Sequence, residues 1–266
     1  MKSSTVCAAF LMLVLAAHVQ ADWYTTITAS NPLNWYRFNE LSGSTAVDYG
    51  SQHLNGTYGV GAEDAIRGVQ GIVGRAAQFS NKSTVFLNGP AITGSWSAEF
   101  VIYPTAFSEA SLIRGQPFAF PSTALKLEQF PHTGLIGYTQ FGVADYTFSP
   151  AVPTPLNQWI DLVYVNTPGS GMKLYLNGVL VGANSHNIDL SRYQFGSNTD
   201  MGSLVGIMNH AVIYNRALSP AEIAAHAAAV PEPSTILLGL AAAISWGSFS
   251  VRRLAARVGR RSIAVA

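Results

Sequence analysis

Residues 173–182 read KLYLNGVLVG, and this stretch decides the fold class. Two short segments rich in apolar residues flank Asn177 and Gly178. Asn and Gly accept the positive φ angles of a type I′ turn, so the stretch predicts a β-hairpin. Immediately before it, Trp159–Val165 predicts another strand, bounded by turn-forming residues.

Similar short segments recur along the chain at irregular intervals of about ten residues, each bounded by Gly, Pro, Asn or Ser. They are Trp35–Phe38, Thr84–Leu87, Ala98–Tyr103, Ser111–Arg114, Ala124–Glu128, Leu135–Tyr138, Tyr146–Phe148 and Ala211–Tyr214. Many short strands separated by turn residues are typical of a β-sandwich. One helix is expected, because Ser219-Pro220-Ala221-Glu222 forms a capping box with proline at the first helical position.

The N-terminal residues are typical of a secretory signal peptide, residues 1–21. Lys2 is the only charged residue before Asp22, and an apolar segment runs from Val6 to Ala17. That segment is too short to span a membrane. Small residues at positions 19 and 21 predict cleavage after Ala21.

The C-terminal residues, 230–261, combine a Pro-Glu-Pro tripeptide, an apolar run at residues 236–251 and five arginines. The prolines favour extended backbone, and the arginines keep their end cytoplasmic. This order resembles the PEP-CTERM sorting signal of Gram-negative bacteria, which implies processing by an exosortase near the tripeptide. An ordinary single-span anchor is the alternative. The residues expected to act in sorting are Pro231, Glu232, Pro233, Arg252 and Arg253.

The body between these ends, residues 22–229, is mildly acidic. Of 15 Lys+Arg in the chain, Lys2 and five arginines belong to the ends, and of 14 Asp+Glu only Glu232 does. The body therefore has a net charge of −4, which argues against nucleic acid because basic patches dominate that affinity. Cys7 is the only cysteine and lies in the signal peptide, so the body has no disulfide and no thiol nucleophile.

Five phrases of the body, in this order, resemble the laminin-G-like, concanavalin A-like domains of secreted bacterial proteins. They are WYRFNELSGSTAVDYGSQHLNGTYG (35–59), GRAAQFSNKSTVFLNG (74–89), SWSAEFVIYP (95–104), NQWIDLVYVNTPGSGMKLYLNGVLVG (157–182) and VGIMNHAVIYNRALSPAEIAAH (205–226). The resemblance implies an all-β fold, a two-sheet antiparallel jelly-roll sandwich with a short C-terminal helix. The hydrophobic segment lies outside this domain.

The resemblance also implies a calcium site between the loop after the first strand and the start of the last strand. Asp48 falls where the family has its loop aspartate, and Asn55 offers an oxygen of the kind that Ca²⁺ prefers. The family's Asp-Glu pair is replaced here by Asn209-His210, of which Asn209 can still donate a carbonyl oxygen. Alternatively, Asp48 only braces its own loop through Asx-type hydrogen bonds. Calcium is the one cofactor that the sequence suggests.

Sugar binding in sandwiches usually combines an exposed aromatic ring with amides and carboxylates. The aromatic residues in or near predicted loops are Trp96, Tyr138, Phe141, Tyr146 and Tyr193. Aromatic residues on predicted strands are more typical of a core, where each buries a large area; these are Trp35, Phe38, Trp159 and Tyr175.

No pattern in the sequence predicts catalysis. Glycoside hydrolases need two carboxylates about 5–10 Å apart. Glu99, Glu128 and Asp161 each stand alone on a predicted strand. The histidines at 53, 132, 186, 210 and 226 lack the spacing of a ligand set and are expected at the surface or in loops. We therefore expect no catalytic residues and no enzyme.

Together these features predict a secreted binding module, sorted by an exosortase to the outer surface or extracellular matrix of a Gram-negative bacterium. Glycan or exopolysaccharide is the expected ligand. Signal peptidase and exosortase are the expected partners during export, while residues 236–251 hold the chain transiently in the inner membrane. A structural or adhesion protein of the matrix, with no small-ligand pocket, is the alternative, and a glycoside hydrolase is the third reading.

Overall fold

The structure is a computed structural model that describes residues 23–87, 91–107, 111–115, 122–190, 193–196 and 202–231. Tyr24–Val230 forms one compact unit. The predicted signal peptide with Ala21 lies outside the described residues, and so do the apolar run and the sorting residues Glu232, Pro233, Arg252 and Arg253. Within the described part of the chain, no helix has both the length and the apolar character needed to cross a membrane.

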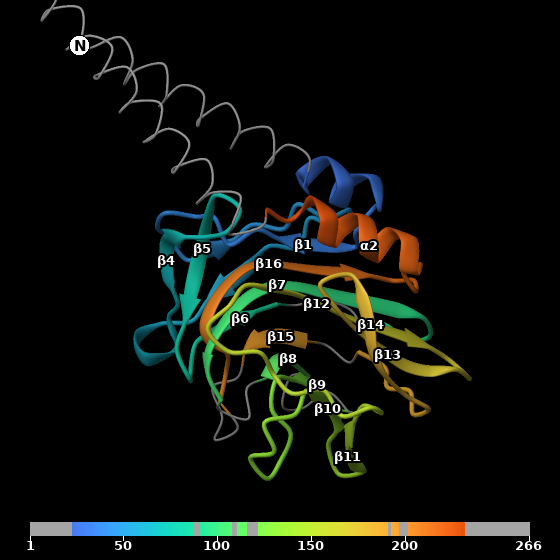
Figure 1. The fold of residues 1–266 in the computed structure, drawn as a ribbon. Coiled ribbons are helices and arrows are strands. Elements are labelled where there is room, and N and C mark those ends of the chain that lie inside the picture. The colour runs from blue at the N-terminus through green and yellow to red at the C-terminus, as the bar shows by residue number, and fades with distance from the viewer. Residues whose placement is uncertain are drawn as a thin grey trace, which may run out of the picture. The chain divides into compact units, whose positions relative to one another are not determined.

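Two antiparallel sheets make up the unit. Sheet A has the order β14-β13-β12-β7-β16-β5-β4, and β1 also pairs with β16. Its strands are β1 (Asn34–Tyr36), β4 (Ile66–Gln70), β5 (Arg75–Phe79), β7 (Trp96–Ala106), β12 (Ile160–Thr167), β13 (Gly171–Leu176), β14 (Val179–Asn184) and β16 (Val205–Tyr214). The long strands β7 and β16 lie side by side in the middle (Figure 1).

Sheet B has the order β11-β10-β9-β8-β15-β6-β3-β2. Its strands are β2 (Thr45–Ala46), β3 (Gly56–Tyr58), β6 (Thr84–Phe86), β8 (Ser111–Gly115), β9 (Thr123–Lys126), β10 (Gly137–Gln140), β11 (Ala144–Thr147) and β15 (Tyr193–Gly196). A short 3₁₀ turn, η1 (Gly61–Glu63), connects β3 to β4. The chain alternates between the sheets, as expected for a sandwich.

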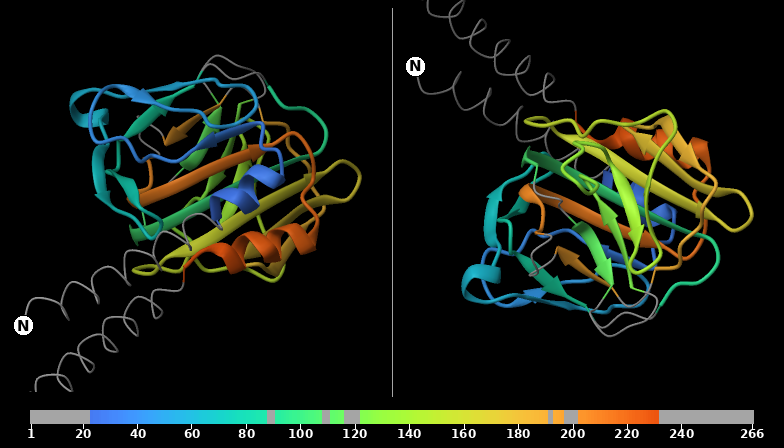
Figure 2. Two further views of the ribbon diagram at one scale, coloured as in Figure 1. Left: turned by 90° about the horizontal axis from the view of Figure 1, so that it is seen from above. Right: turned by 90° about the horizontal axis from the view of Figure 1, so that it is seen from below.

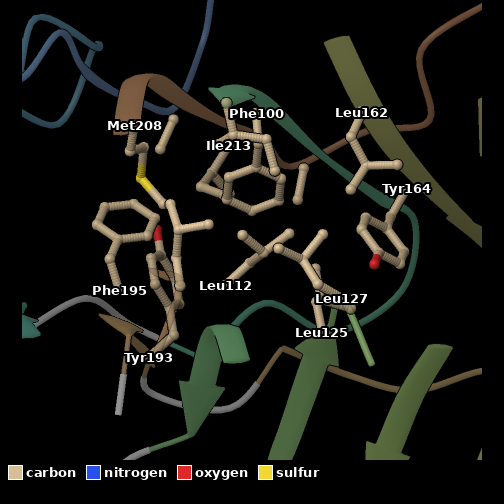
Figure 3. Close-up of a cluster of buried hydrophobic side chains, with 14 of the residues drawn as sticks. Phe100, Leu112, Leu125, Leu127, Leu162, Tyr164, Tyr193, Phe195, Met208 and Ile213 are labelled. Carbon is tan, nitrogen blue, oxygen red and sulfur yellow. The ribbon is translucent and has the colours of Figure 1, made fainter. Parts of the chain in front are cut away.

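An apolar core fills the space between the sheets. Side chains of the two sheets point toward each other in Figure 3: Phe100, Leu162, Tyr164, Met208 and Ile213 from sheet A, and Leu112, Leu125, Leu127, Tyr193 and Phe195 from sheet B and its loops. Successive residues of a strand face opposite sides, so Phe100 enters the core while Glu99 and Val101 point away from it.

The outer face of sheet A is also covered. The helix α2 (Pro220–Ala229) crosses it with Ile223 and His226 buried. The helical residues 24–29 cross the same face beside α2, as Figure 2 shows from above. Polar residues of β7, β12 and β16 on this face are therefore shielded from water.

The predicted sandwich is confirmed, and so are its two sharpest local features. Asn177 and Gly178 have φ angles of 49° and 81°, and the hairpin joins β13 to β14. At the start of α2, the backbone N–H of Glu222 donates to Oγ of Ser219 at 3.2 Å, and the backbone N–H of Ser219 donates to Glu222 Oε2 at 2.8 Å. Both turn and helix thus begin where their residues predict.

Candidate functional site

The loop after β1 is organised around the carboxylate of Asp48, which is buried. Oδ1 accepts hydrogen bonds from the backbone N–H groups of Trp35 at 2.7 Å and Gly50 at 2.8 Å. Oδ2 accepts from the side-chain amide of Asn34 at 2.7 Å and the backbone N–H of Leu54 at 2.8 Å. Four donors occupy about four lone-pair sites of the two oxygens, so the carboxylate ties its loop to β1.

Of the other two residues expected at a calcium site, Asn55 bonds to Asp48, whereas Asn209 bonds to a different segment. Oδ1 of Asn55 accepts from the backbone N–H of Asp48 at 3.0 Å, so these two residues are brought together. Asn209 is buried, and its amide bonds to the β4–β5 turn through Val73 N–H at 2.7 Å and the carbonyls of Val73 and Arg75. Within the described residues, no group of three or more His, Cys, Asp or Glu could hold a metal ion. Calcium binding stays a prediction, and an ion at Asp48 would have to replace existing hydrogen bonds.

The structure separates the candidate aromatic residues into two groups. Trp96, Tyr138 and Tyr193 are buried in the core, whereas Phe141 and Tyr146 are only partly buried. Of the strand aromatics, Trp35, Phe38 and Tyr175 are buried and Trp159 is partly exposed. Tyr146 lies on β11, the edge strand of sheet B, and is the candidate with the most ordered surroundings.

Tyr146 belongs to a stack of three rings at this edge. Its centroid is 5.0 Å from that of Tyr138, with an interplanar angle of 23°. The centroid of the exposed His186 ring lies 4.7 Å from that of Tyr146, with an angle of 27°. Tyr138 is opposite Tyr146 in the β10–β11 register and anchors the stack in the core. The stack therefore carries an aromatic surface from the core to solvent.

Hydrogen bonds hold His186 at the end of the stack. The side chain of Asn184 donates to the carbonyl of Thr147 at 2.7 Å, so its Oδ1 faces His186. That oxygen accepts from the backbone N–H of His186 at 2.9 Å and lies 3.0 Å from its Nδ1, which places the ring proton on Nδ1. The Tyr138 hydroxyl donates to the His186 carbonyl at 2.8 Å.

Two polar tips of the stack are available to a ligand. Neither Nε2 of His186 nor the hydroxyl of Tyr146 has a hydrogen bond to a described residue. With its proton on Nδ1, His186 presents Nε2 as an acceptor, while the Tyr146 hydroxyl can donate or accept. The edge thus combines a flat apolar surface with two groups that can bond hydroxyls.

A polar cluster beneath α2 could not be anticipated from the sequence. Nδ1 of His226 lies 2.8 Å from Oε2 of Glu99, and its Nε2 lies 2.8 Å from Oγ of Ser30. The expectation that the histidines are surface or loop residues is wrong for His226 on α2 and for His210 on β16, since both are fully buried. Burial, and next the charge of Arg37, lower the pKa of His210 to about 3.

Glu99 and Asp161 each stand alone on their strands, as expected, but pairing of β7 with β12 makes them neighbours. In the β7–β12 register Glu99 pairs with Val163 and Asp161 with Val101, so the two acids lie diagonally on one face. Burial, followed by the charge of Glu99, raises the pKa of Asp161 well above its ordinary value. Only strand pairing brings these residues together, and no spacing within one strand signals it.

Comparison with known proteins identifies the domain. Residues 79–224 match the family model described as the concanavalin A-like lectin/glucanases superfamily. No curated protein matches the chain. Among solved structures, domain 4 of an extracellular arabinanase from Geobacillus stearothermophilus, in complex with arabinotriose, is similar with a TM-score of 0.56 and 19% identity. The match covers 74% of this chain and 98% of that one.

Two larger proteins contain a similar part. The receptor-binding domain of botulinum neurotoxin D has a TM-score of 0.55 at 16% identity, over 74% of this chain and 52% of that one. A Trypanosoma rangeli sialidase has a TM-score of 0.54 at 11% identity, over 81% of this chain and 38% of that one. The chain thus spans about half or less of these two proteins, and at such identities the likeness concerns the fold.

These comparisons contradict the expectation that the protein is not an enzyme. The matched family includes glucanases, and the similar structures include parts of an arabinanase and a sialidase. Because the family model covers more than half of its residues, the chain belongs to the concanavalin A-like lectin/glucanases superfamily.

Proposed function

We propose that this protein is an exported carbohydrate-binding module and that the ring stack ending in Tyr146 and His186 contacts the sugar. The observation that carries the proposal is the 4.7 Å stacking of these two rings at the edge of sheet B. Membership of a superfamily that includes lectins supports the ligand class.

The stack has the physical properties that a sugar face requires. A pyranose ring presents a flat patch of C–H groups bordered by hydroxyls, and an aromatic surface buries that patch favourably. Tyr146 is fixed by Tyr138 on one side, and Asn184 fixes His186, so little side-chain freedom is lost on binding. The Tyr146 hydroxyl and His186 Nε2 supply the hydrogen bonds that orient the sugar.

Export is proposed from the sequence alone. The signal peptide at residues 1–21 and the sorting signal at 230–261 would direct the domain to the outer surface or matrix, through signal peptidase and an exosortase. A polysaccharide of that environment is the corresponding ligand.

The test is binding of the full-length chain, in mild detergent, to an array of neutral and acidic polysaccharides, followed by calorimetry with the best ligand. Wild-type protein should bind saturably. Tyr146→Ala should weaken binding about fivefold, because it removes a hydroxyl and the ring that supports His186, a loss of about 1 kcal/mol. His186→Ala should act in the same direction.

Phe86→Ala is the matched control. Phe86 is 37% exposed and lies on β6, five strands from β11 in sheet B, or about 24 Å at 4.8 Å per strand. Its loss should leave the affinity unchanged. Absence of saturable binding to any polysaccharide would favour the alternative, a structural matrix protein. Equal losses in all three variants would show that the stack is not the site.

A further inference from the structure

A second cluster of aromatic residues surrounds a cation on the outer face of sheet A. Trp35 on β1 and Arg37 just after it are two residues apart, so their side chains leave the same side of the backbone. Tyr24 comes from the helical residues 24–29. Tyr49 comes from the loop braced by Asp48, where its backbone N–H donates to the Trp35 carbonyl at 2.8 Å. We call Tyr24, Trp35, Arg37 and Tyr49 the Arg37 box.

The guanidinium group of Arg37 is in contact with all three rings. Its central carbon lies 4.2 Å from the centroid of Tyr24, 4.0 Å from that of Trp35 and 3.9 Å from that of Tyr49. The rings themselves meet edge to face, with Trp35 at 5.6 Å from Tyr24 and 6.2 Å from Tyr49. Cation–π contacts on this scale hold the guanidinium plane in one orientation.

Arg37 has no anionic partner among the described residues. Two other described arginines form ion pairs, Arg67 with Asp64 and Arg216 with Glu222. Arg75 is exposed, so water solvates its charge. Arg37 is half-buried, makes no hydrogen bond to a described residue, and its Nε is shielded from solvent.

Among the residues that the structure describes, none around Arg37 supplies a carboxylate partner. His210 lies behind Trp35, whose Nε1 donates to His210 Nδ1 at 3.2 Å, so the imidazole is neutral. Burial lowers the pKa of Arg37, because a half-buried cation loses hydration. A guanidinium with unused donors, held rigidly and partly out of water, is suited to an anionic oxygen group that can accept two hydrogen bonds.

We propose that the Arg37 box binds the anionic oxygen group of an acidic polysaccharide, a uronic-acid carboxylate or a sulfate ester, as a site separate from the Tyr146–His186 stack. The anion accepts hydrogen bonds from the guanidinium, and Tyr49, which is 40% exposed, contacts the sugar ring that carries it. The polysaccharide nature of this ligand rests on the proposed function, whereas the requirement for an anion rests on Arg37.

The experiment measures binding of the full-length chain to polygalacturonate, dextran sulfate and neutral dextran. Wild-type protein should bind at least one of the two anionic polymers at least tenfold more tightly than dextran, and this preference should shrink as salt is added. The polymer preferred distinguishes a carboxylate from a sulfate. No preference for either anionic polymer would overturn the proposal.

Arg37→Gln should abolish the preference, and Arg37→Lys should retain part of it, because lysine keeps the charge but lacks the planar fork. Arg75→Gln is the matched control, since it removes the same charge from an exposed position. If Arg75→Gln lowers the preference as much as Arg37→Gln does, general attraction explains it and the proposal fails. Tyr49→Leu tests the sugar contact without changing any charge and should weaken binding to the preferred anionic polymer.

The two sites fail independently. If Tyr146→Ala binds like wild type while Arg37→Gln loses the preference for anionic polymers, the Arg37 box is supported as a binding site. The ring stack is then not a binding site. If Arg37→Gln keeps the anion preference while Tyr146→Ala weakens binding to every polymer, the reverse holds. Melting temperatures of all variants identify any loss of folding. If Arg37→Gln does not fold, the anion preference of Arg37→Lys decides whether the Arg37 box binds the anion.

Discussion

Nδ1 of His226 lies 2.8 Å from Oε2 of Glu99, although 127 residues separate them in the sequence. His226 is on α2 and Glu99 is on β7, and both are fully buried. On the other side of the imidazole, Nε2 lies 2.8 Å from Oγ of Ser30, directly after the helical residues 24–29. The three groups tie both helical segments to the outer face of sheet A.

This contact predicts that the protein loses stability at alkaline pH. Burial alone would lower the pKa of His226, but the charge and hydrogen bond of Glu99 outweigh it and raise the pKa above 6.5. A raised pKa contributes stability that is complete below the unfolded-state value and is lost as pH rises through the folded-state value. Asp161, whose pKa is also raised, acts in the same direction. The melting temperature should therefore fall as the pH rises above about 6.5, the ordinary pKa of histidine.

The variant His226→Gln tests which group causes the fall of melting temperature with rising pH. Glutamine cannot carry the charge, so we expect a flatter pH profile and, at pH 6, a loss of about 3 kcal/mol, because the buried Glu99 carboxyl loses its partner. Arg216 and Glu222 also act on the pKa of His226, and Tyr214 stacks on its ring, so Glu222→Gln is measured alongside. A His226→Gln profile as steep as that of wild type would contradict the assignment.

A second prediction concerns the stability of the loop that carries Tyr49, which the Asp48 carboxylate holds in place. Asp48→Ala leaves three backbone N–H groups and the Asn34 amide without their acceptor. We expect a loss of about 3 kcal/mol in the free energy of unfolding, measured by urea denaturation. Asp48→Asn should cost less, because Oδ1 still accepts while the new amide faces two donors.

The same variants test the predicted calcium ion. If calcium binds at Asp48, added Ca²⁺ raises the melting temperature of wild-type protein by mass action and a chelator reverses the rise. Asp48→Asn should then respond less. Identical melting curves of wild-type protein with Ca²⁺ and with chelator would exclude calcium at this loop.

Most of the fold could be predicted from patterns of residues that are close together in the sequence. The Asn177-Gly178 turn and the Ser219 capping box depend on adjacent residues, and both occur where predicted. Strands without such signals were missed: β2 has two residues, β3 has three, and β4 is partly exposed on both faces and contains Gly68 with φ of 74°. β15 is buried throughout, so it shows no alternation of apolar and polar residues.

The sites were harder to predict because they depend on contacts between distant segments. Tyr146 was one of five candidate rings, and only coordinates show that Trp96, Tyr138 and Tyr193 point into the core. Its partner His186 comes from a different part of the chain. The Arg37 box was not predicted, because nothing in the sequence places Tyr24 and Tyr49 against the same guanidinium.

A further prediction concerns the packing of α2 against the turn that contains Gly178. Its φ is 81°, and a Cβ at this position would lie 3.0 Å from Cβ of Ala227 and 3.3 Å from Cα of Ala224 on α2. Gly169 has a similar φ of 78° but nothing within 4 Å of the corresponding Cβ position. Gly169→Ala should therefore cost only the backbone strain, about 1 kcal/mol, and Gly178→Ala about 1–2 kcal/mol more. Equal costs in urea denaturation would mean that α2 does not pack on the turn.

The proposed export route makes the last prediction, which mass spectrometry of protein from the native host can check. Signal peptidase should cut after Ala21, and an exosortase should cut near Pro231-Glu232-Pro233, so the mature chain should begin at Asp22 and lack residues 236–266. The processed product would keep the entire unit Tyr24–Val230, because both cuts fall outside it. Replacing Pro231 and Pro233 by alanine should block the second cut and leave the protein in the inner-membrane fraction. Mature protein that retains Arg252 and Arg253 in wild-type cells would instead indicate an ordinary membrane anchor, since those arginines can stay cytoplasmic only while the apolar run remains attached.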